Sequence, residues 1–463
     1  MSVLQSHWRE LSAALAVIFY LLLCVCVLWR FRQQHPRRQA LQAGGILLAY
    51  ASQGGEAERI ARYSAAQFSG HPAITLLPLS QVDEAALGAA SLALFVVSTY
   101  GEGEPPDNGV AFDRRVLARP DLSLPALRFA VLALGDSEYR HFCAFGERVF
   151  EKLSVSGAKN VTPLLKADRS DVNTLDQWQH QLAALGAVNR VGADELPASF
   201  QATEPVLNPW RLVRREKLNS HHSGGLGSVN PVFLLEFIPD GNADLADWQA
   251  GDLAEIIPYN DTEQLRRQYS IASVPAERRL LLLIRLHLDE HGKAGVASGW
   301  LCGEINVGEC VQLAIRKHEI FHGPAADVPM ILIGNGTGIA GLRSHLAQRE
   351  NQRAAADWLL WGERSRAHDF YFHEQVQHWK ISGRLARLDT VFSRDGGPHR
   401  YVQDCLATAG TELQHWLARG AAIYVCGSRE GMAQGVDQVL RQQLGDNQVD
   451  QLLADGRYRR DVY

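Results

Sequence analysis

The feature that most constrains this chain is a regular alternation of apolar, strand-like segments and amphipathic helical segments, which begins at Gly45. The first four apolar segments are each followed by a turn and a helical stretch, and a further helix is predicted over 174–188. Strands that alternate with helices in this order favour a doubly wound parallel sheet. The strands of this sheet are predicted at 46–50, 73–79, 92–98, 128–134 and 160–165.

A second region is rich in strand-like segments and poor in helices, which predicts a small antiparallel β-barrel. Its strands are predicted at 232–238, 253–259, 268–273, 279–288 and 310–315.

After the barrel the α/β pattern returns, with an opening strand near 329 and later strands at 358–363, 385–392 and 421–428. A length of 463 residues fits several domains. The predicted fold is therefore multidomain, with α/β and β parts. Its domains are predicted as an N-terminal segment over 1–40, an α/β domain over 41–189, a proline-containing linker over 190–209, a barrel over 210–325 and a second α/β domain over 326–463.

The N-terminal segment contains an uncharged apolar run over 11–29, about as long as the 20 residues that a membrane-spanning helix needs. Arg30, Arg32, Arg37 and Arg38 follow it, and positive residues favour the cytoplasmic side of a membrane. We therefore expect a single-pass transmembrane helix in the inner membrane, with the catalytic domains in the cytoplasm. The alternative, a cleaved signal peptide, would carry a small-residue cleavage site after the run instead of an arginine cluster.

Charge and cysteine usage exclude several classes of protein. The net charge of −5 is too acidic for non-specific nucleic-acid binding, which needs a basic surface. The seven cysteines include no Cys-x-x-Cys pair, so no disulfide framework and no zinc or other metal site is predicted. This usage fits a reducing compartment.

Three loops of the first α/β domain follow strands at the sheet edge where such folds bind ligands. The loop at 52–59 contains glycines and enters a helix, an arrangement whose backbone amides favour a phosphate. The loops at 98–108 and 134–147 each carry a tyrosine, Tyr100 and Tyr139, and two such rings could clamp a planar group between them. Ordinary glycine turns and half-buried loop tyrosines are the alternative interpretation of each loop taken alone.

Taken together, these loops resemble the FMN-binding domain of the diflavin reductases, a family that includes the microsomal cytochrome reductases and the flavoprotein subunit of bacterial sulfite reductase. The resemblance implies ring stacking by Tyr100 and Tyr139, and a looser match puts the acidic Asp168 near the flavin. It implies phosphate contacts by Ser52, Gln53, Gly54, Gly55, Glu56 and Ala57, and further flavin contacts by Ser98, Thr99, Gly101, Gly103, Leu134, Gly135, Asp136 and Phe142.

The phosphate loop departs from the pattern of that family, which reads Ser-Gln-Thr-Gly-Thr or Ser-Gln-Thr-Gly-Asn. This chain has Gly54 in place of the threonine and Glu56 at the last position. Hydroxyl donors are lost and a carboxylate is added beside a dianionic phosphate. We expect FMN to bind through backbone amides, more weakly than usual.

In the predicted barrel, the segments 267–273 and 295–301 resemble the FAD-binding barrel of the ferredoxin–NADP⁺ reductases. The resemblance assigns Arg267 to the FAD pyrophosphate and Tyr269 to its ring. A period of two puts these two residues on one face of the strand and Ser270 on the other, unless the strand bends. An ordinary strand and an ordinary helix cap are the alternatives. The phosphate turn is assigned to Gly295, Val296, Ala297 and Ser298.

The segment 334–341, Gly-Asn-Gly-Thr-Gly-Ile-Ala-Gly, resembles the NADP(H)-binding loop of the same family and places Gly336 and Thr337 at the nucleotide. The segment 392–403 resembles the site of the ribose 2′-phosphate. His399 stands where the family usually has a lysine, so we expect Arg400 to supply that charge and NADPH to be preferred over NADH. A solvated basic loop is the alternative. The residues that match the 2′-phosphate site are Ser393, Arg394, Tyr401 and Gln403.

The resemblance also supplies a set for hydride transfer, Ser270, Cys426 and Asp461, which would orient the nicotinamide beside the flavin. The hydride chemistry itself belongs to the cofactors. Tyr463 corresponds to the C-terminal aromatic residue that stacks on the FAD ring in the family and must move before the nicotinamide can land.

One family feature is missing. Most diflavin reductases insert a helical connecting domain of about a hundred residues into the barrel, and this chain has only a short segment between Pro258 and Arg266. We therefore expect a looser FMN domain that swings between FAD and an outside acceptor. An acidic rim on that domain suggests a partner with a basic face, and a set of ordinary solvated loops is the alternative. The rim consists of Glu56, Glu58, Glu102, Glu104, Asp107, Asp136 and Glu138.

The sequence thus predicts a membrane-anchored NADPH-dependent diflavin reductase that passes electrons from NADPH to FAD, then to FMN, and on to a one-electron acceptor. The expected acceptors are a haem protein, ferric iron or a ferric chelate at the membrane, or a sulfite-reductase-like partner. The alternative is an NADPH–FAD oxidoreductase, or a regulatory membrane protein, whose first domain is a docking module without FMN.

Overall fold

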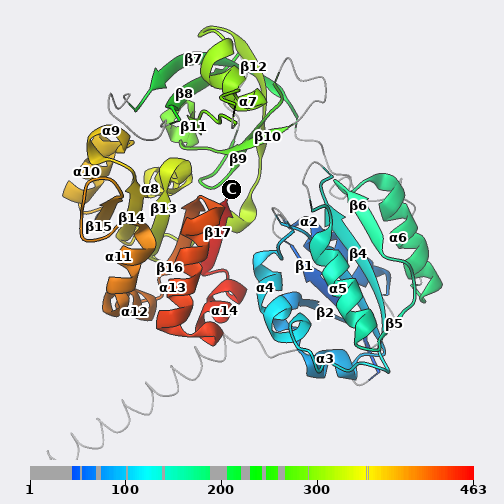
Figure 1. Cartoon of the computed structure of the whole chain (residues 1–463). Coiled ribbons are helices and arrows are strands. Elements are labelled where there is room, and N and C mark those ends of the chain that lie inside the picture. The colour runs from blue at the N-terminus through cyan, green and yellow to red at the C-terminus, as the bar shows by residue number, and fades with distance from the viewer. Residues whose placement is uncertain are drawn as a thin grey trace, which may run out of the picture.

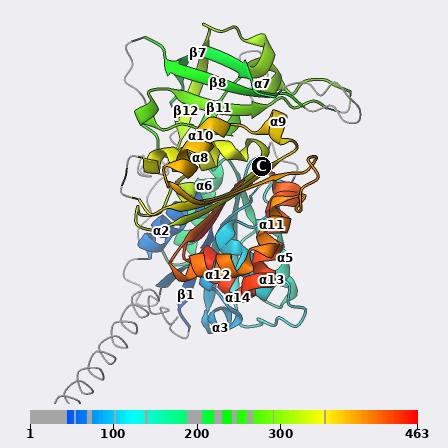
Figure 2. The ribbon, with the colours of Figure 1, turned by 90° about the vertical axis from the view of Figure 1, so that its left-hand side faces the viewer.

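The computed structural model of the chain describes residues 44–52, 55–68, 74–100, 103–137, 141–187, 206–219, 230–241, 247–258, 266–289, 291–350, 352 and 354–463. These residues form a first α/β unit, a β-barrel unit and a second α/β unit. Figures 1 and 2 place the barrel unit at one end of the molecule, with the two α/β units below it. The C-terminal end lies where the three units meet (Figure 1).

The first α/β unit is built on a parallel sheet with the strand order β2-β1-β3-β4-β5, and β6 also pairs with β4. All six residues of β1 are buried, because alternate side chains enter the cores on the two faces. Leu47 and Ala49 pack in one core, while Leu48 and Tyr50 pack in the other. The strands are β1 (Ile46–Ala51), β2 (Ile74–Pro78), β3 (Leu92–Ser98), β4 (Arg128–Gly135), β5 (Lys159–Asn160) and β6 (Leu165–Asp168).

Helices cover both faces of this sheet, as the alternating sequence pattern predicts. Two helices begin at an aspartate whose side chain accepts a backbone N–H of the first turn: Asp83 from Ala86 at 2.8 Å and Asp171 from Thr174 at 2.8 Å. The helices are α2 (Glu56–Gln67), α3 (Glu84–Ala89), α4 (Val110–Phe112), α5 (Ala144–Val155) and α6 (Val172–Ala184). One predicted strand, 160–165, is wrong, because it is divided into β5 and β6.

The barrel unit is a six-stranded antiparallel sheet with the order β10-β9-β12-β7-β8-β11. A bridge between Ile271 and Leu282 joins the end of β10 to β11, so the two edge strands meet. The residues assigned to the end of the linker belong in part to the sheet, since β7 begins at Asn208. The elements are β7 (Asn208–Lys217), β8 (Val232–Pro239), β9 (Leu253–Ile256), β10 (Arg267–Ser270), β11 (Leu280–Arg285), α7 (Val296–Gly299) and β12 (Cys310–Arg316).

The second α/β unit is a parallel sheet with the order β15-β14-β13-β16-β17. Its last strand, β17, pairs only at the β16 edge and was not predicted from the sequence. The strands are β13 (Met330–Asn335), β14 (Asp357–Glu363), β15 (Leu385–Phe392), β16 (Ala422–Gly427) and β17 (Tyr458–Val462). The helices are α8 (Ile339–Glu350), α9 (Arg366–Asp369), α10 (His373–Ile381), α11 (Val402–Thr408), α12 (Gly410–Ala418), α13 (Gln434–Leu444) and α14 (Asp446–Ala454).

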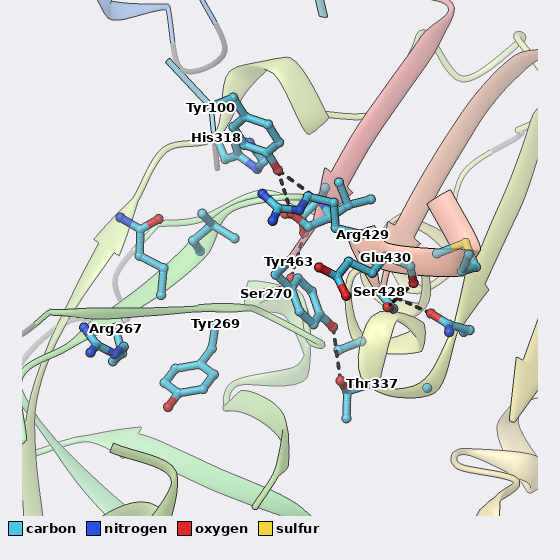
Figure 3. A pocket seen from close by; sticks show the side chains of 18 of the residues that line it. Tyr100, Arg267, Tyr269, Ser270, His318, Thr337, Ser428, Arg429, Glu430 and Tyr463 are labelled. Carbon is cyan, nitrogen blue, oxygen red and sulfur yellow. Dashed lines mark hydrogen bonds between the residues drawn. The ribbon is translucent and has the colours of Figure 1, made fainter. Parts of the chain in front are cut away.

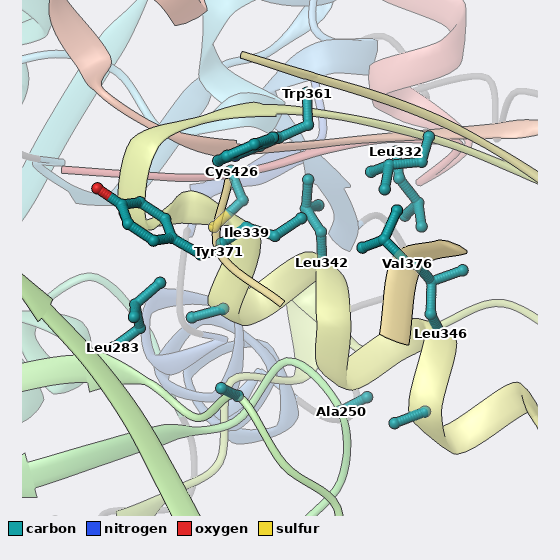
Figure 4. Close-up of a cluster of buried hydrophobic side chains, with 14 of the residues drawn as sticks. Ala250, Leu283, Leu332, Ile339, Leu342, Leu346, Trp361, Tyr371, Val376 and Cys426 are labelled. Carbon is teal, nitrogen blue, oxygen red and sulfur yellow. The ribbon is translucent and has the colours of Figure 1, made fainter. Parts of the chain in front are cut away.

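The barrel and the second α/β unit share one apolar core. Leu283 and Ala250 of the barrel unit pack in the same cluster as Leu332, Leu342 and Trp361 of the second unit (Figure 4). This shared core holds the two units together, because separating them would expose its apolar side chains to water.

The predicted location in a membrane is contradicted. Among the described residues, which begin at Gly44, no helix is long and apolar enough to cross a bilayer. The segment 11–29, on which the prediction of a transmembrane helix was based, lies outside the described residues. The single-pass, inner-membrane assignment is therefore not retained.

Candidate functional site

All three units line one cavity of about 2280 Å³. The loops at the carboxyl ends of both parallel sheets open into it, and β10 and β11 of the barrel form another wall. Ligands bind at this edge of open parallel sheets. Of the predicted site residues, the cavity is lined by Ser52, Glu56, Ser98, Thr99, Tyr100, Leu134, Gly135, Asp136, Phe142, Arg267, Tyr269, Ser270, Gly336, Thr337, Ser393, Arg400, Tyr401, Gln403, Asp461 and Tyr463.

The remaining predicted residues fall into two groups. Gln53, Gly54, Gly101 and Tyr139 lie outside the described residues, so the second ring of the predicted clamp has no structural account. The described residues that are not among those lining the cavity are Gly55, Ala57, Gly103, Asp168, Gly295, Val296, Ala297, Ser298, Arg394 and Cys426.

The phosphate loop of the first unit leads into α2, whose first turn contains Glu56. Gly55 precedes the helix with φ of 81°, a conformation that favours glycine. Ser52 lines the cavity, and its buried hydroxyl has no hydrogen-bond partner among the described residues. A buried hydroxyl without a partner is costly, and a phosphate oxygen at this helix N-terminus would satisfy it. The described part of this loop therefore fits the phosphate of FMN.

The two other loops of the first unit are held by local hydrogen bonds. The Asp168 carboxylate accepts the Ser137 N–H at 2.9 Å and the Ser137 hydroxyl at 2.6 Å. Asp168 is therefore not one of the residues that line the cavity. Its carboxylate instead holds the loop that carries Asp136. Tyr100 stands on the opposite loop and is half-buried.

On the barrel side, β10 carries Arg267, Tyr269 and Ser270, and all three line the cavity (Figure 3). Tyr269 packs against the core of the barrel, whereas the Ser270 hydroxyl donates to Asp461 of β17. The predicted phosphate turn lies just behind the wall: the Ser298 hydroxyl accepts the His287 N–H at 3.1 Å, and His287 lines the cavity.

On the second unit, the nucleotide loop lies very close to β16. A Cβ atom at Gly338 would lie 2.1 Å from the Cys426 carbonyl oxygen, so only glycine fits there. Gly336 has φ of 56° and brings Thr337 to the cavity. Because this tight turn carries no side chains at its glycines, a nucleotide phosphate could come close to its backbone and to the N-terminus of α8.

The three residues assigned to hydride transfer lie together, although they come from β10, β16 and β17. The Ser270 hydroxyl donates to the Asp461 carboxylate at 2.7 Å, and the Cys426 thiol lies 3.5 Å from the same oxygen. Burial and the neighbouring Asp461 raise the pKa of Cys426 well above its ordinary value, so its thiol stays protonated. Cys426 is fully buried and reaches the cavity only through these two neighbours.

Tyr463 follows β17 and projects into the cavity. The residue as a whole is 59% exposed, and its hydroxyl lies 3.1 Å from the Thr337 hydroxyl (Figure 3). Its backbone N–H donates to Gly427 at 3.1 Å, and its backbone oxygen accepts the Arg429 N–H at 3.0 Å. The backbone is thus held while the ring faces open space.

Sequence reasoning missed several basic residues of the cavity wall. Arg429 follows the Cys-Gly-Ser segment at the end of β16, and Arg364 follows β14; the position after a parallel strand was the available signal for both. The missed cationic residues of the wall are Arg59, Arg169, Arg266, Arg285, Arg316, Lys317, Arg364 and Arg429. A wall with this charge suits a cavity that receives phosphorylated ligands.

Two protein families match this chain. Flavodoxin matches residues 48–180, and the oxidoreductase NAD-binding domain matches residues 332–438. The first match covers most of the first α/β unit, and the second covers most of the second.

The chain is also similar over most of its length to proteins named sulfite reductase [NADPH] flavoprotein alpha-component. The relative from Yersinia enterocolitica is 28% identical, over 92% of this chain and 91% of its own length. The relative from Bacillus subtilis is 26% identical, over 90% of this chain and 89% of its own. The first alignment has 552 positions, more than the 463 residues of this chain, so that relative carries residues without a counterpart here.

These similarities confirm two predictions. The chain is an NADPH-dependent flavoprotein oxidoreductase, and its cofactors are FMN, FAD and NADPH. They also support a diflavin reductase. The buried Ser52 hydroxyl, the tight turn at Gly338 and the basic residues of the cavity wall fit such a protein, because each suits a phosphorylated cofactor.

Proposed function

We propose that this chain carries electrons from NADPH, through bound FAD and then bound FMN, to a one-electron acceptor. Flavins accept two electrons together and release them singly, which is the chemistry that this exchange requires. One NADPH becomes NADP⁺, and two acceptor molecules are each reduced by one electron.

The observation that carries the proposal is the single cavity shared by the three units. A nucleotide held at Gly336 and Thr337, a flavin ring beside Tyr269 and a second flavin held from Ser52 would all open into the same space. Electron transfer between two flavins needs their rings to lie close together. This arrangement supports transfer within one chain without a second subunit.

The residues of this chain would orient the reactants and exclude water. In this proposal, Arg400 and Ser393 bind the 2′-phosphate of NADPH, and Asp461 orders Ser270 and the Cys426 thiol beside the nicotinamide. The protonated thiol adds no negative charge at that position. Tyr463 covers the flavin until the nicotinamide takes its place.

For the acceptor we propose a haem protein or a ferric complex that takes one electron at a time. The names of the relatives support this class, since each is described as one component of a sulfite reductase. A partner of the sulfite reductase type falls within the class.

The test uses the purified full chain. We expect FMN and FAD in equal amounts after heat release, and reduction of cytochrome c with NADPH that is much faster than with NADH. Absence of FMN would reduce the chain to an NADPH–FAD oxidoreductase with a docking module. Absence of cytochrome c reduction with either nucleotide, in protein that contains both flavins, would contradict the proposed acceptor class.

A further inference from the structure

The strand β17 lies between the first α/β unit and the cavity, and its successive residues serve the two sides in turn. Arg460 and the Val462 carbonyl face the first unit. Asp461 and Tyr463 face Ser270 and Thr337 at the cavity. Alternation along a strand therefore joins the loop beside FMN to the residue that covers FAD.

Three contacts link the first unit to this end of the chain. The Tyr100 hydroxyl donates to the Val462 carbonyl oxygen at 2.7 Å. Desolvation raises the pKa of Tyr100 above its ordinary value, so the hydroxyl stays protonated and donates. The Arg460 Nε donates to Asp107 at 2.8 Å, and both of these side chains are more than four-fifths buried.

The third contact involves Arg429. Its guanidinium lies 3.3 Å from the Glu104 carboxylate of the first unit, while its backbone N–H holds the Tyr463 backbone oxygen. Figure 3 shows Tyr100, Arg429 and Tyr463 gathered at this point. Two residues of the predicted acidic rim thus face arginines of the same chain.

We propose that seating of the first α/β unit holds Tyr463 over the FAD site, so that access of the nicotinamide depends on whether the FMN-bearing unit is docked. Tyr100, Glu104 and Asp107 are positioning residues in this arrangement, because they act on Tyr463 through Val462, Arg429 and Arg460. The inference rests on the proposed function, since it assumes that both flavins are bound.

Some contacts of β17 and Tyr463 do not involve the first unit and should therefore remain when that unit undocks. β17 stays paired with β16, and Tyr463 keeps its bond to Gly427. Undocking is therefore expected to loosen the last residues without unfolding the strand. The ring is the part able to move, because its only hydrogen bond among the described residues is to Thr337.

A matched control exists on the same docking surface. Arg114 and Arg115 of the first unit pair with Asp450 on α14, the helix that precedes β17 in the chain. Arg114→Gln removes one of the two arginines at Asp450, whereas Arg115 keeps the docking contact there and Tyr100, Glu104 and Asp107 stay in place. Asp107→Asn keeps the size of the side chain but removes its charge beside Arg460.

The experiment measures the rate at which NADPH bleaches the flavin absorbance of the full chain in a single turnover, at low salt. We expect Asp107→Asn to accelerate bleaching about fivefold, the lower end of coupling between linked sites. Arg114→Gln is expected to leave the rate within twofold of the wild type, because the contacts to β17 persist. Bound FMN and FAD are quantified in each protein first.

A double-mutant cycle separates coupling from a local structural effect. In a Tyr463→Ala background, where no ring covers the flavin, Asp107→Asn should no longer accelerate bleaching. Equal acceleration in both backgrounds, or none in either with both flavins bound, would overturn the coupling and leave the proposed function intact. Absence of FMN from the wild type would instead overturn the proposed function.

Discussion

The second α/β unit contacts both the barrel and the first α/β unit, and the two boundaries differ in the interactions that dominate them. Its boundary with the barrel is built around a continuous apolar core, in which Leu283, Ala272 and Phe321 pack with Leu332 and Trp361. The ion pairs Arg285–Glu363 and Arg343–Glu277 flank this core. Its boundary with the first unit depends instead on ion pairs and on the Tyr100 hydrogen bond. Apolar burial is not screened by salt, whereas pairs between partly exposed charges are. We therefore expect the boundary with the barrel to stay closed and the boundary with the first unit to open.

The largest effect is expected where the apolar boundary is broken. Phe321 is fully buried, and its ring packs against His345 and Tyr424 at centroid distances of 5.3 Å. We expect Phe321→Ala to lower the free energy of unfolding of the joined barrel and second unit by about 3–5 kcal/mol, the usual cost of removing a buried phenylalanine.

Urea unfolding followed by the release of FAD fluorescence measures this loss. Phe150→Ala, in the core of the first unit, is the matched control, because Phe150 packs on Phe129 far from this boundary. Release of FAD at the same urea concentration in Phe321→Ala and wild type would show that the two units do not share a cooperative core.

A smaller effect is expected from acid at the same boundary. His345 is buried against Phe321 and Tyr424, and burial, followed by the charge of Arg349, lowers its pKa from about 6.5 to about 3. The unfolded chain binds a proton below pH 6.5 that the folded chain does not. Stability therefore falls as pH drops from 6.5 towards 3, by about 1.4 kcal/mol per pH unit for this group.

The variant His345→Phe removes the titrating group and keeps the ring. Between pH 7.5 and pH 5 we expect it to lose about 2 kcal/mol less than the wild type in the free energy of unfolding. The exposed His180 of the first unit provides the control, as His180→Gln should not alter the pH dependence of FAD release. Equal pH slopes in His345→Phe and wild type would contradict a neutral His345.

The sequence predicted the architecture well because strand periodicity and glycine loops are local signals. The loops around Ser52, Tyr100 and Thr337 all reach the cavity, as expected from their positions after strands, and Tyr269 reaches it from β10. The sequence could not predict how the units sit together. Asp107 and Arg460 are 353 positions apart, and each reads locally as a solvated surface charge.

The same limit bears on two expectations. The acidic rim pointed to an outside partner, yet Glu104 and Asp107 meet Arg429 and Arg460 of this chain. The looser first unit expected from the missing connecting domain stays a prediction, which scattering of the full chain in solution tests. Opposite charges on segments far apart in the sequence supply the contact between the two units, and no local sequence pattern contains that information.

The smallest effect is expected at the ionic boundary, where Arg114 and Arg115 both pair with the buried Asp450 of α14. Their own side chains are 34% and 44% exposed, so the pairs are open to screening. We expect the double substitution Arg114→Gln with Arg115→Gln to weaken docking by about 1 kcal/mol, near the upper end for exposed pairs. The free energy of unfolding of the joined barrel and second unit should not change, because the apolar core is untouched.

Small-angle scattering of the flavin-loaded full chain measures docking as the radius of gyration. The wild type should expand as NaCl rises from about 0.1 M to about 1 M, which shortens the screening length from about 10 Å to about 3 Å. The double variant should reach the same expansion at lower salt. The pair Arg119 and Glu84 lies within the first unit, so Arg119→Gln should follow the wild-type curve. A radius of gyration independent of salt in every protein would place the two boundaries in one class and remove the distinction between them.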